Sequence, residues 1–280
     1  MVKIKRILKL SVLLLTTGAF TACSGGSGEN PAVFGNMGSA FSSQEDANSA
    51  ASVPDKSTQT AAAISPEPDY EWDKVVALTF DDGPNTTTTN EVLDVLEKHN
   101  VVASFFLVGN NINDESAKTV KRAYGLGCEI NNHSKSHGYM DKMTAEEIKA
   151  EFDFVDQKVL EITGERTKFF RPPYIAVGDL MWENIGAPFI SGLGCNDWDN
   201  KVSVERRVSI ITKSVRDGSI VLMHDAQGNS KTVEAIDQII PALKKQGYKF
   251  TTVSGLFQAK GVTPVTNMIY SNAVQESMWG

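Results

Sequence analysis

Residues 75–84 read Val-Val-Ala-Leu-Thr-Phe-Asp-Asp-Gly-Pro, a short apolar run that ends in two adjacent carboxylates and a Gly-Pro pair. The run from Val75 to Phe80 predicts a buried strand, and the Gly-Pro pair predicts a turn directly after it. In architectures with parallel strands, functional groups gather on the loops beyond the carboxyl ends of the strands. Asp81 and Asp82 stand at such an end, where either chemistry or simple hydrogen bonding of the loop would explain them.

Short apolar runs alternate with longer amphipathic stretches along the rest of the chain to about residue 257. This alternation predicts an α/β fold, with helices packed around a largely parallel sheet or barrel. Thr144 and Glu147 have the spacing of a capping box, so we expect a helix to begin there. We expect strands at 75–80, 103–108, 129–131, 168–170, 189–191, 219–223 and 249–252, and helices at 90–99, 116–124, 144–162, 203–215 and 232–245.

Other expected strand ends also carry polar side chains. His133 and His137 follow the third strand, and their spacing places both on one side of a helical turn, where two imidazoles can reach one ion. With one carboxylate from another strand end they would form a set of two histidines and one carboxylate, which leaves positions open for water and substrate. Arg171 precedes two prolines, and His224 ends an apolar run. A surface ion pair and a core histidine are the alternatives for these two residues.

Taken together, these stretches resemble the five ordered motifs of the polysaccharide deacetylases, carbohydrate esterase family 4, whose catalytic domain is called NodB-like. The resemblance covers about residues 75–257. It implies one catalytic domain, with a distorted (β/α) barrel of seven or eight strands, which we place at residues 71–260. The motifs are Thr79-Phe80-Asp81-Asp82-Gly83-Pro84, His133-x-x-x-His137, Arg171-x-Pro173-Tyr174, Asp197-Trp198 and Leu222-x-His224.

The resemblance also implies a role for each motif residue. A divalent metal, commonly zinc with Co²⁺, Ni²⁺ or Mn²⁺ as alternatives, would be bound by Asp82, His133 and His137. Asp81 would be the general base, positioned by Arg171 and Asp197, and His224 would be the general acid. The backbone N–H of Tyr174 would contribute to the oxyanion site, and Trp198 and Leu222 would shape the pocket for the acetyl group.

The activity that follows first from this resemblance is removal of N-acetyl groups from N-acetylhexosamine residues of a polysaccharide, such as peptidoglycan or a chitin-like chain. An O-acetyl esterase acting on xylan or another acetylated glycan is the alternative, since the same groups serve an ester. A non-catalytic glycan- or metal-binding lipoprotein is a third reading, which the intact motif residues argue against. Gly194, Gly138 and Asn131 depart from residues common in the family and leave the substrate open.

The amino terminus predicts export. Four bases precede the apolar run from Leu10 to Leu15, which is too short to span a bilayer and reads as a signal peptide over residues 1–22. Small residues before Cys23 resemble a bacterial lipoprotein cleavage box, so we expect a lipid on Cys23 and a domain held at the cell membrane, facing the cell wall. Residues 23–70 are mostly polar, and their apolar residues follow neither the helical nor the strand period, which predicts a disordered tether. Residues 261–280 are a C-terminal extension that the sequence leaves without a role.

Composition excludes several other classes of protein. The chain has 280 residues, 41% hydrophobic residues and a net charge of −7, which argues against a nucleic-acid partner. Most of the acidic excess lies in the tether. Three cysteines cannot supply a disulfide framework. Cys128 and Cys195 are therefore expected as thiols, with a single disulfide between them as the alternative, and we expect a monomer.

Overall fold

The computed structural model describes residues 74–274. The strands are β1 (Val75–Asp81), β2 (Ser104–Leu107), β3 (Glu129–Asn132), β4 (Phe189–Ile190), β5 (Leu193–Gly194), β6 (Ser219–His224), β7 (Lys249–Thr251) and β8 (Ile269–Tyr270). The helices are α1 (Thr88–His99), α2 (Ser116–Gly125), α3 (Ala145–Thr163), α4 (Asp179–Asn184), α5 (Val204–Ser214), α6 (Ser230–Lys245) and α7 (Val253–Ala259). This order confirms the expected α/β class.

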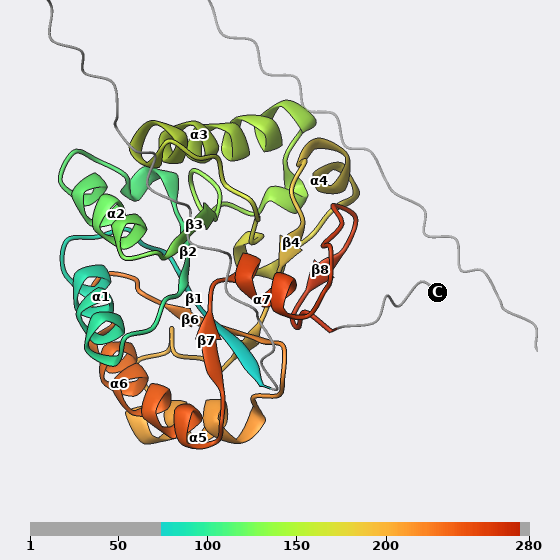
Figure 1. Cartoon of the computed structure of the whole chain (residues 1–280). Coiled ribbons are helices and arrows are strands. Elements are labelled where there is room, and N and C mark those ends of the chain that lie inside the picture. The colour runs from blue at the N-terminus through green and yellow to red at the C-terminus, as the bar shows by residue number, and fades with distance from the viewer. Residues whose placement is uncertain (1–73, 275–280) are drawn as a thin grey trace, which may run out of the picture. The chain divides into compact units, whose positions relative to one another are not determined.

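The strands form a parallel sheet in the order β3-β2-β1-β6-β5, with β7 beside the first half of β1, and a second parallel pair, β4-β8. Phe170 links the two by single bridges to Asn132 and to Phe189. Helices α1, α2, α3, α5 and α6 surround the strands, and α7 crosses the middle of the view (Figure 1). The described residues thus form two parallel sheets joined by single bridges, and the closed barrel of seven or eight strands stays a prediction.

Side chains along β1 alternate between two apolar clusters, because successive residues of a strand point to opposite faces. Val76, Leu78 and Phe80 pack outward in the large cluster under the helices. Val75 and Ala77 pack inward, in a cluster that includes Val253, Leu256 and Phe257 of α7. Asp81 continues the inward-facing series at the carboxyl end of β1. The alternation therefore places the first carboxylate inside the fold and not on its surface.

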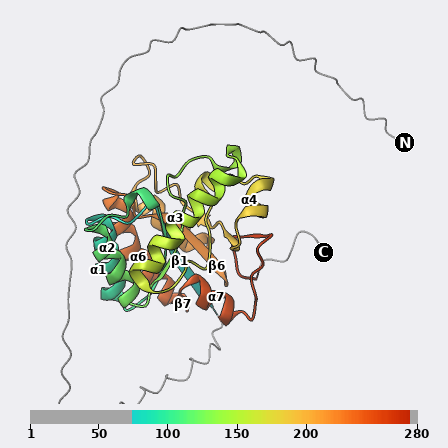
Figure 2. The ribbon, with the colours of Figure 1, turned by 90° about the horizontal axis from the view of Figure 1, so that it is seen from above.

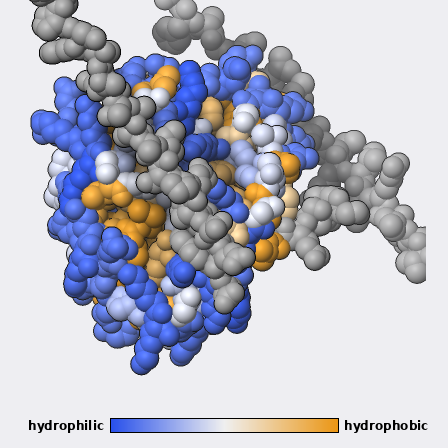
Figure 3. Space-filling model, viewed as in Figure 1, coloured by the Kyte–Doolittle hydropathy of each residue, from blue (hydrophilic) through white to orange (hydrophobic). Residues whose placement is uncertain are grey.

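The helices keep their polar sides toward solvent. The face drawn in Figure 3 is mostly hydrophilic, with its apolar residues gathered in a few patches. Viewed from above, α1, α2, α3 and α6 again lie around the strands (Figure 2). In the part of the chain that the structure describes, no helix combines the length and the apolar character needed to cross a bilayer.

Most expected elements are present within a few residues. The capping box at the start of α3 is confirmed, since the Thr144 hydroxyl accepts from the Glu147 N–H and the Glu147 carboxylate accepts from the Thr144 N–H. The strand expected at 168–170 is reduced to the bridges at Phe170. Four short elements were not among those expected: α4, α7, β5 and β8.

The segment after residue 260 joins the same body. Its strand β8 pairs with β4, and Asn272 bridges Ser219 at the start of β6. The signal peptide, Cys23 and the tether all lie outside the described residues. Cys128 and Cys195 are both buried with free thiols, so the disulfide between them does not form. Burial raises the pKa of Cys128 to about 11 and that of Cys195 to about 12, which keeps both thiols protonated.

Candidate active site

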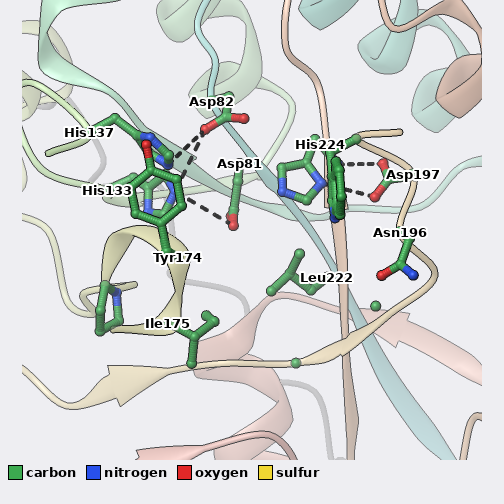
Figure 4. A pocket seen from close by; sticks show the side chains of 14 residues that line it. Asp81, Asp82, His133, His137, Tyr174, Ile175, Asn196, Asp197, Leu222 and His224 are labelled. Atoms are coloured by element: carbon green, nitrogen blue, oxygen red, sulfur yellow. Dashed lines mark hydrogen bonds and ion pairs between the residues drawn. The ribbon is translucent and has the colours of Figure 1, made fainter. Parts of the chain in front are cut away.

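Three strand ends and one loop meet at a single pocket of about 490 Å³ (Figure 4). Asp81 ends β1, His133 follows β3, and His224 ends β6 directly opposite Asp81 in the ladder. The loop after Phe170 closes one side. The pocket is lined by Asp81, Asp82, His133, His137, Pro172, Tyr174, Ile175, Gly192, Gly194, Asn196, Asp197, Trp198, Leu222 and His224. Every residue that the family resemblance assigned to the site, apart from Arg171, therefore lines this one cavity.

Asp82, His133 and His137 converge on one point. Oδ1 of Asp82 lies 3.7 Å from Nε2 of His133 and 3.4 Å from Nε2 of His137. Ligand atoms about 2.1 Å from a tetrahedral zinc ion stand about 3.4 Å apart. The three side chains thus fit a divalent metal with little movement, and two of them are imidazoles, which suit zinc and its transition-metal neighbours.

The surroundings of His133 prepare its Nε2 for a metal. Its Nδ1 lies 2.7 Å from the Arg171 carbonyl oxygen, to which it donates, so the lone pair is on Nε2. His133 is buried, and burial lowers its pKa despite the raising influence of Asp81 and Asp82. A neutral imidazole is the form that binds a metal.

The two histidines do not share a helical turn, so that part of the prediction was wrong. The segment is a loop in which Ser134 and His137 both have positive φ, 67° and 58°. The His137 N–H donates to the Ser134 hydroxyl, which stabilises this loop locally. Spacing alone favours a turn of helix, but β3 ends at Asn132 and the chain must reverse beside the pocket.

Asp81 is held by Arg171 as expected. Nη1 of Arg171 lies 2.5 Å from Oδ1 of Asp81, and Nη2 donates to the Ser191 carbonyl at 2.9 Å. Both side chains are buried, and the guanidinium stacks over the Phe106 ring at 4.0 Å. Burial raises the pKa of Asp81, but the charge and hydrogen bond of Arg171, with the charge of His224, outweigh it and hold the pKa below its usual value. The carboxylate is ionised and oriented.

Asp197 serves the acid and not the base, which corrects its expected role beside Asp81. Its Oδ1 lies 2.9 Å from Nδ1 of His224, and its Oδ2 accepts the His224 N–H at 2.8 Å. The Thr232 hydroxyl also donates to it. Burial lowers the pKa of His224, but the hydrogen bond and charge of Asp197 outweigh this and raise it to about 9. His224 is therefore a cation at neutral pH, with Nε2 left for a substrate atom.

The remaining motif residues form the rim of the pocket. Leu222 and Trp198 both line the pocket, and the Trp198 side chain is 66% exposed. Tyr174 has φ 59°, a left-handed conformation that a residue with a side chain adopts only under strain. Its ring stacks on Tyr139 with centroids 4.2 Å apart and meets His137 edge-on at 4.6 Å. Sequence reasoning missed Tyr139, because nothing local links it to a loop 35 positions away.

Asp225 was also missed, although it directly follows His224. It is buried behind the pocket, where its Oδ1 accepts the Gly83 N–H at 3.0 Å and its Oδ2 lies 2.5 Å from the Thr89 hydroxyl. A carboxylate at a strand end was the same signal that drew attention to Asp81 and Asp82. The structure shows that this one faces the protein and not the cavity.

The pocket combines a metal-binding set, an ionised buried carboxylate and a protonated histidine. Nε2 of His133 lies 3.8 Å from Oδ2 of Asp81, so the carboxylate stands beside the ligand cluster and opposite His224. A base and an acid on two sides of one cavity suit hydrolysis of an ester or an amide, in which one proton is removed from water and another is given to the leaving atom.

Comparison with known proteins agrees with this arrangement. A family model described as polysaccharide deacetylase matches residues 70–186. The chain is 50% identical over 200 residues to a bifunctional xylanase/deacetylase of Pseudobutyrivibrio xylanivorans, a match of 71% of this chain and 33% of that protein. It is 37% identical over 196 residues to a peptidoglycan-N-acetylglucosamine deacetylase of Bacillus cereus, covering 67% of this chain and 90% of that protein.

Two solved structures share the fold closely. The Xyl-CE4 domain of a multidomain xylanase from the hindgut metagenome of Trinervitermes trinervoides matches with TM-score 0.71 and 48% identity, over 72% of this chain and 99% of that one. A family 4 acetyl xylan esterase from Clostridium thermocellum, in complex with a cobalt ion, matches with TM-score 0.71 and 38% identity. The match covers 72% of this chain and 100% of that one. The chain spans between a third and a half of the length of the first curated relatives. With this site on this fold, the chain belongs to the polysaccharide deacetylase family.

Proposed function

We propose that this chain hydrolyses acetyl groups on a polysaccharide, with Asp81 as general base and His224 as general acid. The observation that carries the proposal is that one pocket holds both an ionised carboxylate, Asp81, and a protonated imidazole, His224. Arg171 keeps the buried Asp81 ionised, while Asp197 raises the pKa of His224 to about 9, so base and acid are both ready at neutral pH.

Asp82, His133 and His137 would hold the divalent metal. When bound, such an ion supplies Lewis-acid chemistry, polarising a carbonyl and lowering the pKa of water to about 7. The donor set fits zinc and cobalt equally well, and a cobalt ion is present in the related acetyl xylan esterase. We therefore propose metal dependence without assigning the metal used in the cell.

The protein's own groups complete the reaction. Asp81 accepts a proton from the attacking water, whose oxygen bonds to the acetyl carbon. The Tyr174 N–H donates to the carbonyl oxygen as negative charge develops on it. His224 then gives its proton to the sugar oxygen or nitrogen as the bond to the acetyl carbon breaks, leaving acetate and a free hydroxyl or amine. Trp198 and Leu222 confine the methyl group.

For the substrate we propose O-acetyl groups of xylan first and N-acetyl groups of peptidoglycan second, which reverses the order that the sequence favoured. The specific support is identity: the relatives named for xylan match at 50%, 48% and 38%, and the first relatives named for peptidoglycan at 34–37%. Both bonds suit the same base. An alkoxide leaves more easily than an amide anion, so an ester needs the acid less.

Acetate release from acetylated xylan, N-acetylglucosamine oligomers and peptidoglycan, measured in parallel on the metal-loaded protein, tests the proposal. We expect the highest kcat/KM on xylan, and loss of about 10³-fold in Asp81→Asn on every substrate. His224→Ala should lose more on the amide than on the ester. Asp237→Asn, which changes an exposed carboxylate far from the pocket, is the matched control. Acetate release by Asp81→Asn at the rate of the unaltered protein would exclude the mechanism.

We also propose that the chain is exported and held at the membrane by a lipid on Cys23. The bases at positions 3, 5, 6 and 9, the short apolar run and the small residues before Cys23 support this. Mass spectrometry of the mature amino terminus from bacterial membranes checks it. A lipid-modified cysteine is expected, and Cys23→Ala should release the protein from the membrane fraction. An unmodified Cys23 would contradict it.

A further inference from the structure

Asp225 is a buried carboxylate that the reaction does not use. It does not line the pocket, and its side chain is fully buried. In the described part of the chain no cation is recorded against it, and its partners are the Gly83 N–H and the Thr89 hydroxyl. An isolated buried carboxylate costs free energy, so its position needs a compensating role.

Besides the contact with Thr89 of α1, three contacts of Asp225 reach the turn that carries the base and one metal ligand. Its backbone N–H donates to the Asp81 carbonyl at 3.0 Å, its Oδ1 accepts the Gly83 N–H, and its carbonyl accepts from the Asn85 amide at 2.7 Å. Asp82 lies between the two bonded positions. Asp225 thus holds the backbone on both sides of Asp82.

Asp82 needs such support. Its φ of 74° is a left-handed conformation, which costs a residue with a side chain about 1–3 kcal/mol and persists only where neighbours enforce it. Gly83 is equally constrained, since a Cβ there would collide with Oδ2 of Asp225. The close approach of carboxylate and backbone therefore requires glycine at 83.

We propose that Asp225 is a positioning residue, which locks the turn from Asp81 to Gly83 onto the end of β6 and so sets the metal ligand and the base at a fixed distance from the acid. His224 immediately precedes Asp225, so one short segment fixes both sides of the site. This inference rests on the proposed function for its kinetic readout, but its metal-binding readout is independent of any substrate.

The chain contains its own control for a purely structural role. Asp217 lies before β6, and its Oδ1 accepts the Val75 N–H at 2.9 Å, where β1 begins. It connects the same two strands at their other end, far from the pocket, and also pairs with Lys260. If these carboxylates only stabilise the sheet, their substitutions will have the same consequences.

The test compares Leu and Asn at position 225 with Leu at position 217, each in the full chain. Asp225→Leu should lower kcat about 100-fold with KM changed less than about threefold, as expected for a displacement near 1 Å. Its Co²⁺ affinity, measured by calorimetric titration, should fall at least about tenfold, the effect of losing support for a ligand. Asp225→Asn keeps an acceptor for the Gly83 N–H and should retain at least about a third of kcat. Asp217→Leu should lower the melting temperature but leave kcat and Co²⁺ affinity unchanged.

Gly83→Ala disturbs the same contact from the other side and decides the question if Asp225→Leu does not fold. Its added Cβ should push the two segments apart and lower Co²⁺ affinity at least about tenfold. The proposal is overturned if folded Asp225→Leu matches Asp217→Leu in kcat and Co²⁺ affinity, if Asp225→Asn is as impaired as Asp225→Leu, or if Gly83→Ala binds Co²⁺ normally. Should no substrate be turned over, the proposed function fails, and the Co²⁺ titrations still decide the role of Asp225.

Discussion

The two ends of the parallel strands use the same backbone conformation for opposite purposes. At the amino ends, the turns before β3, β6 and β7 have positive φ at Gly127, Gly218 and Gly247. Around the pocket at the carboxyl ends, positive φ falls on residues with side chains, namely Asp82, Ser134, His137, Tyr174, Ile175 and Asn196. Glycine adopts this conformation without strain, whereas other residues cost about 1–3 kcal/mol each.

The difference teaches where this molecule concentrates strain. The turns that only reverse the chain use glycine or, before β2, Asn100, a residue type that tolerates this conformation. A turn that must present a ligand or an N–H to a substrate keeps its side chain and accepts the strain. We therefore expect substitutions at the carboxyl ends to lower activity more than stability, and substitutions at the amino ends to lower stability alone.

The largest effect is expected for His133→Ala. Loss of this ligand should lower Co²⁺ affinity by more than about 100-fold, beyond the effect of losing a supporting hydrogen bond, and acetate release should fall to background. The melting temperature of the metal-free protein should fall much less than the activity, because the side-chain hydrogen bond of His133 is the one to the Arg171 carbonyl and its backbone N–H still donates to the Leu107 carbonyl. Calorimetric titration with Co²⁺ and an acetate assay check both expectations.

His99→Ala is the matched control, because His99 is the one histidine outside the pocket in the part of the chain that the structure describes. It pairs with Asp237 on a helical surface. Normal Co²⁺ binding by His133→Ala would exclude His133 as a metal ligand and contradict the functional role of the carboxyl ends. Impaired Co²⁺ binding by His99→Ala would show that any histidine change disturbs the fold.

A smaller effect, seen mainly in pH dependence, is expected for Asp197→Asn. His224 must be protonated to act as the acid, so activity should fall as pH rises through its pKa of about 9. Removing the Asp197 charge should move this alkaline limit down by at least about one pH unit, because the largest raising influence is lost, and should lower kcat about 10- to 100-fold. Profiles of kcat against pH for the two proteins give the result.

The same pair affects stability with a defined sign. Since folding raises the pKa of His224 above its unfolded value of 6.5, the protonated histidine stabilises the fold fully below pH 6.5, and this contribution is lost as pH rises toward 9. Asp197→Asn should remove that slope from melting temperatures measured across the range. Asp237→Asn, at the exposed pair with His99, should change neither profile. An unmoved alkaline limit in Asp197→Asn would exclude His224 as the titrating acid.

The site residues at strand ends were predictable from the sequence, whereas the contacts between distant loops were not. Strand ends carry their signal locally: Asp81, Asp82 and His224 each follow an apolar run, so their gathering at one edge follows from parallel strands. The partner of Asp197 depends on how a loop meets a strand end 27 positions later, and the stack of Tyr139 on Tyr174 depends on two loops meeting. Neither leaves a periodic or local mark in the sequence.

Several elements of the fold were hidden for a similar reason. Strands β5 and β8 have two residues each, too few to show a period of two, and β8 pairs with β4 far away in the sequence. The loop from His133 to His137 has the spacing of a helix but begins where a buried strand ends. Long helices such as α3 were predictable because the capping residues and the spacing of the apolar residues can both be read from one continuous stretch of sequence.

The smallest effect on activity is expected for Gly218→Ala, at the amino end of β6. Gly218 has φ 77°, and an added Cβ would stand 2.7 Å from the Asn272 amide oxygen. The conformation and the contact together should lower the free energy of unfolding by about 1–3 kcal/mol, as measured by denaturant titration. kcat and Co²⁺ affinity should stay within about twofold, because the strain lies at the far end of β6 from His224.

Two further glycines separate the causes of that loss. Gly247→Ala, with φ 89° and no atom near the added Cβ, should show the cost of conformation alone, and Gly125→Ala, with neither problem, should be neutral or slightly stabilising at the end of α2. Equal losses in Gly218→Ala and Gly247→Ala would assign the whole cost to the backbone. If Gly218→Ala instead lowered kcat as Asp225→Leu is expected to, strain would pass along β6 from one end to the other, and the two ends would not be independent.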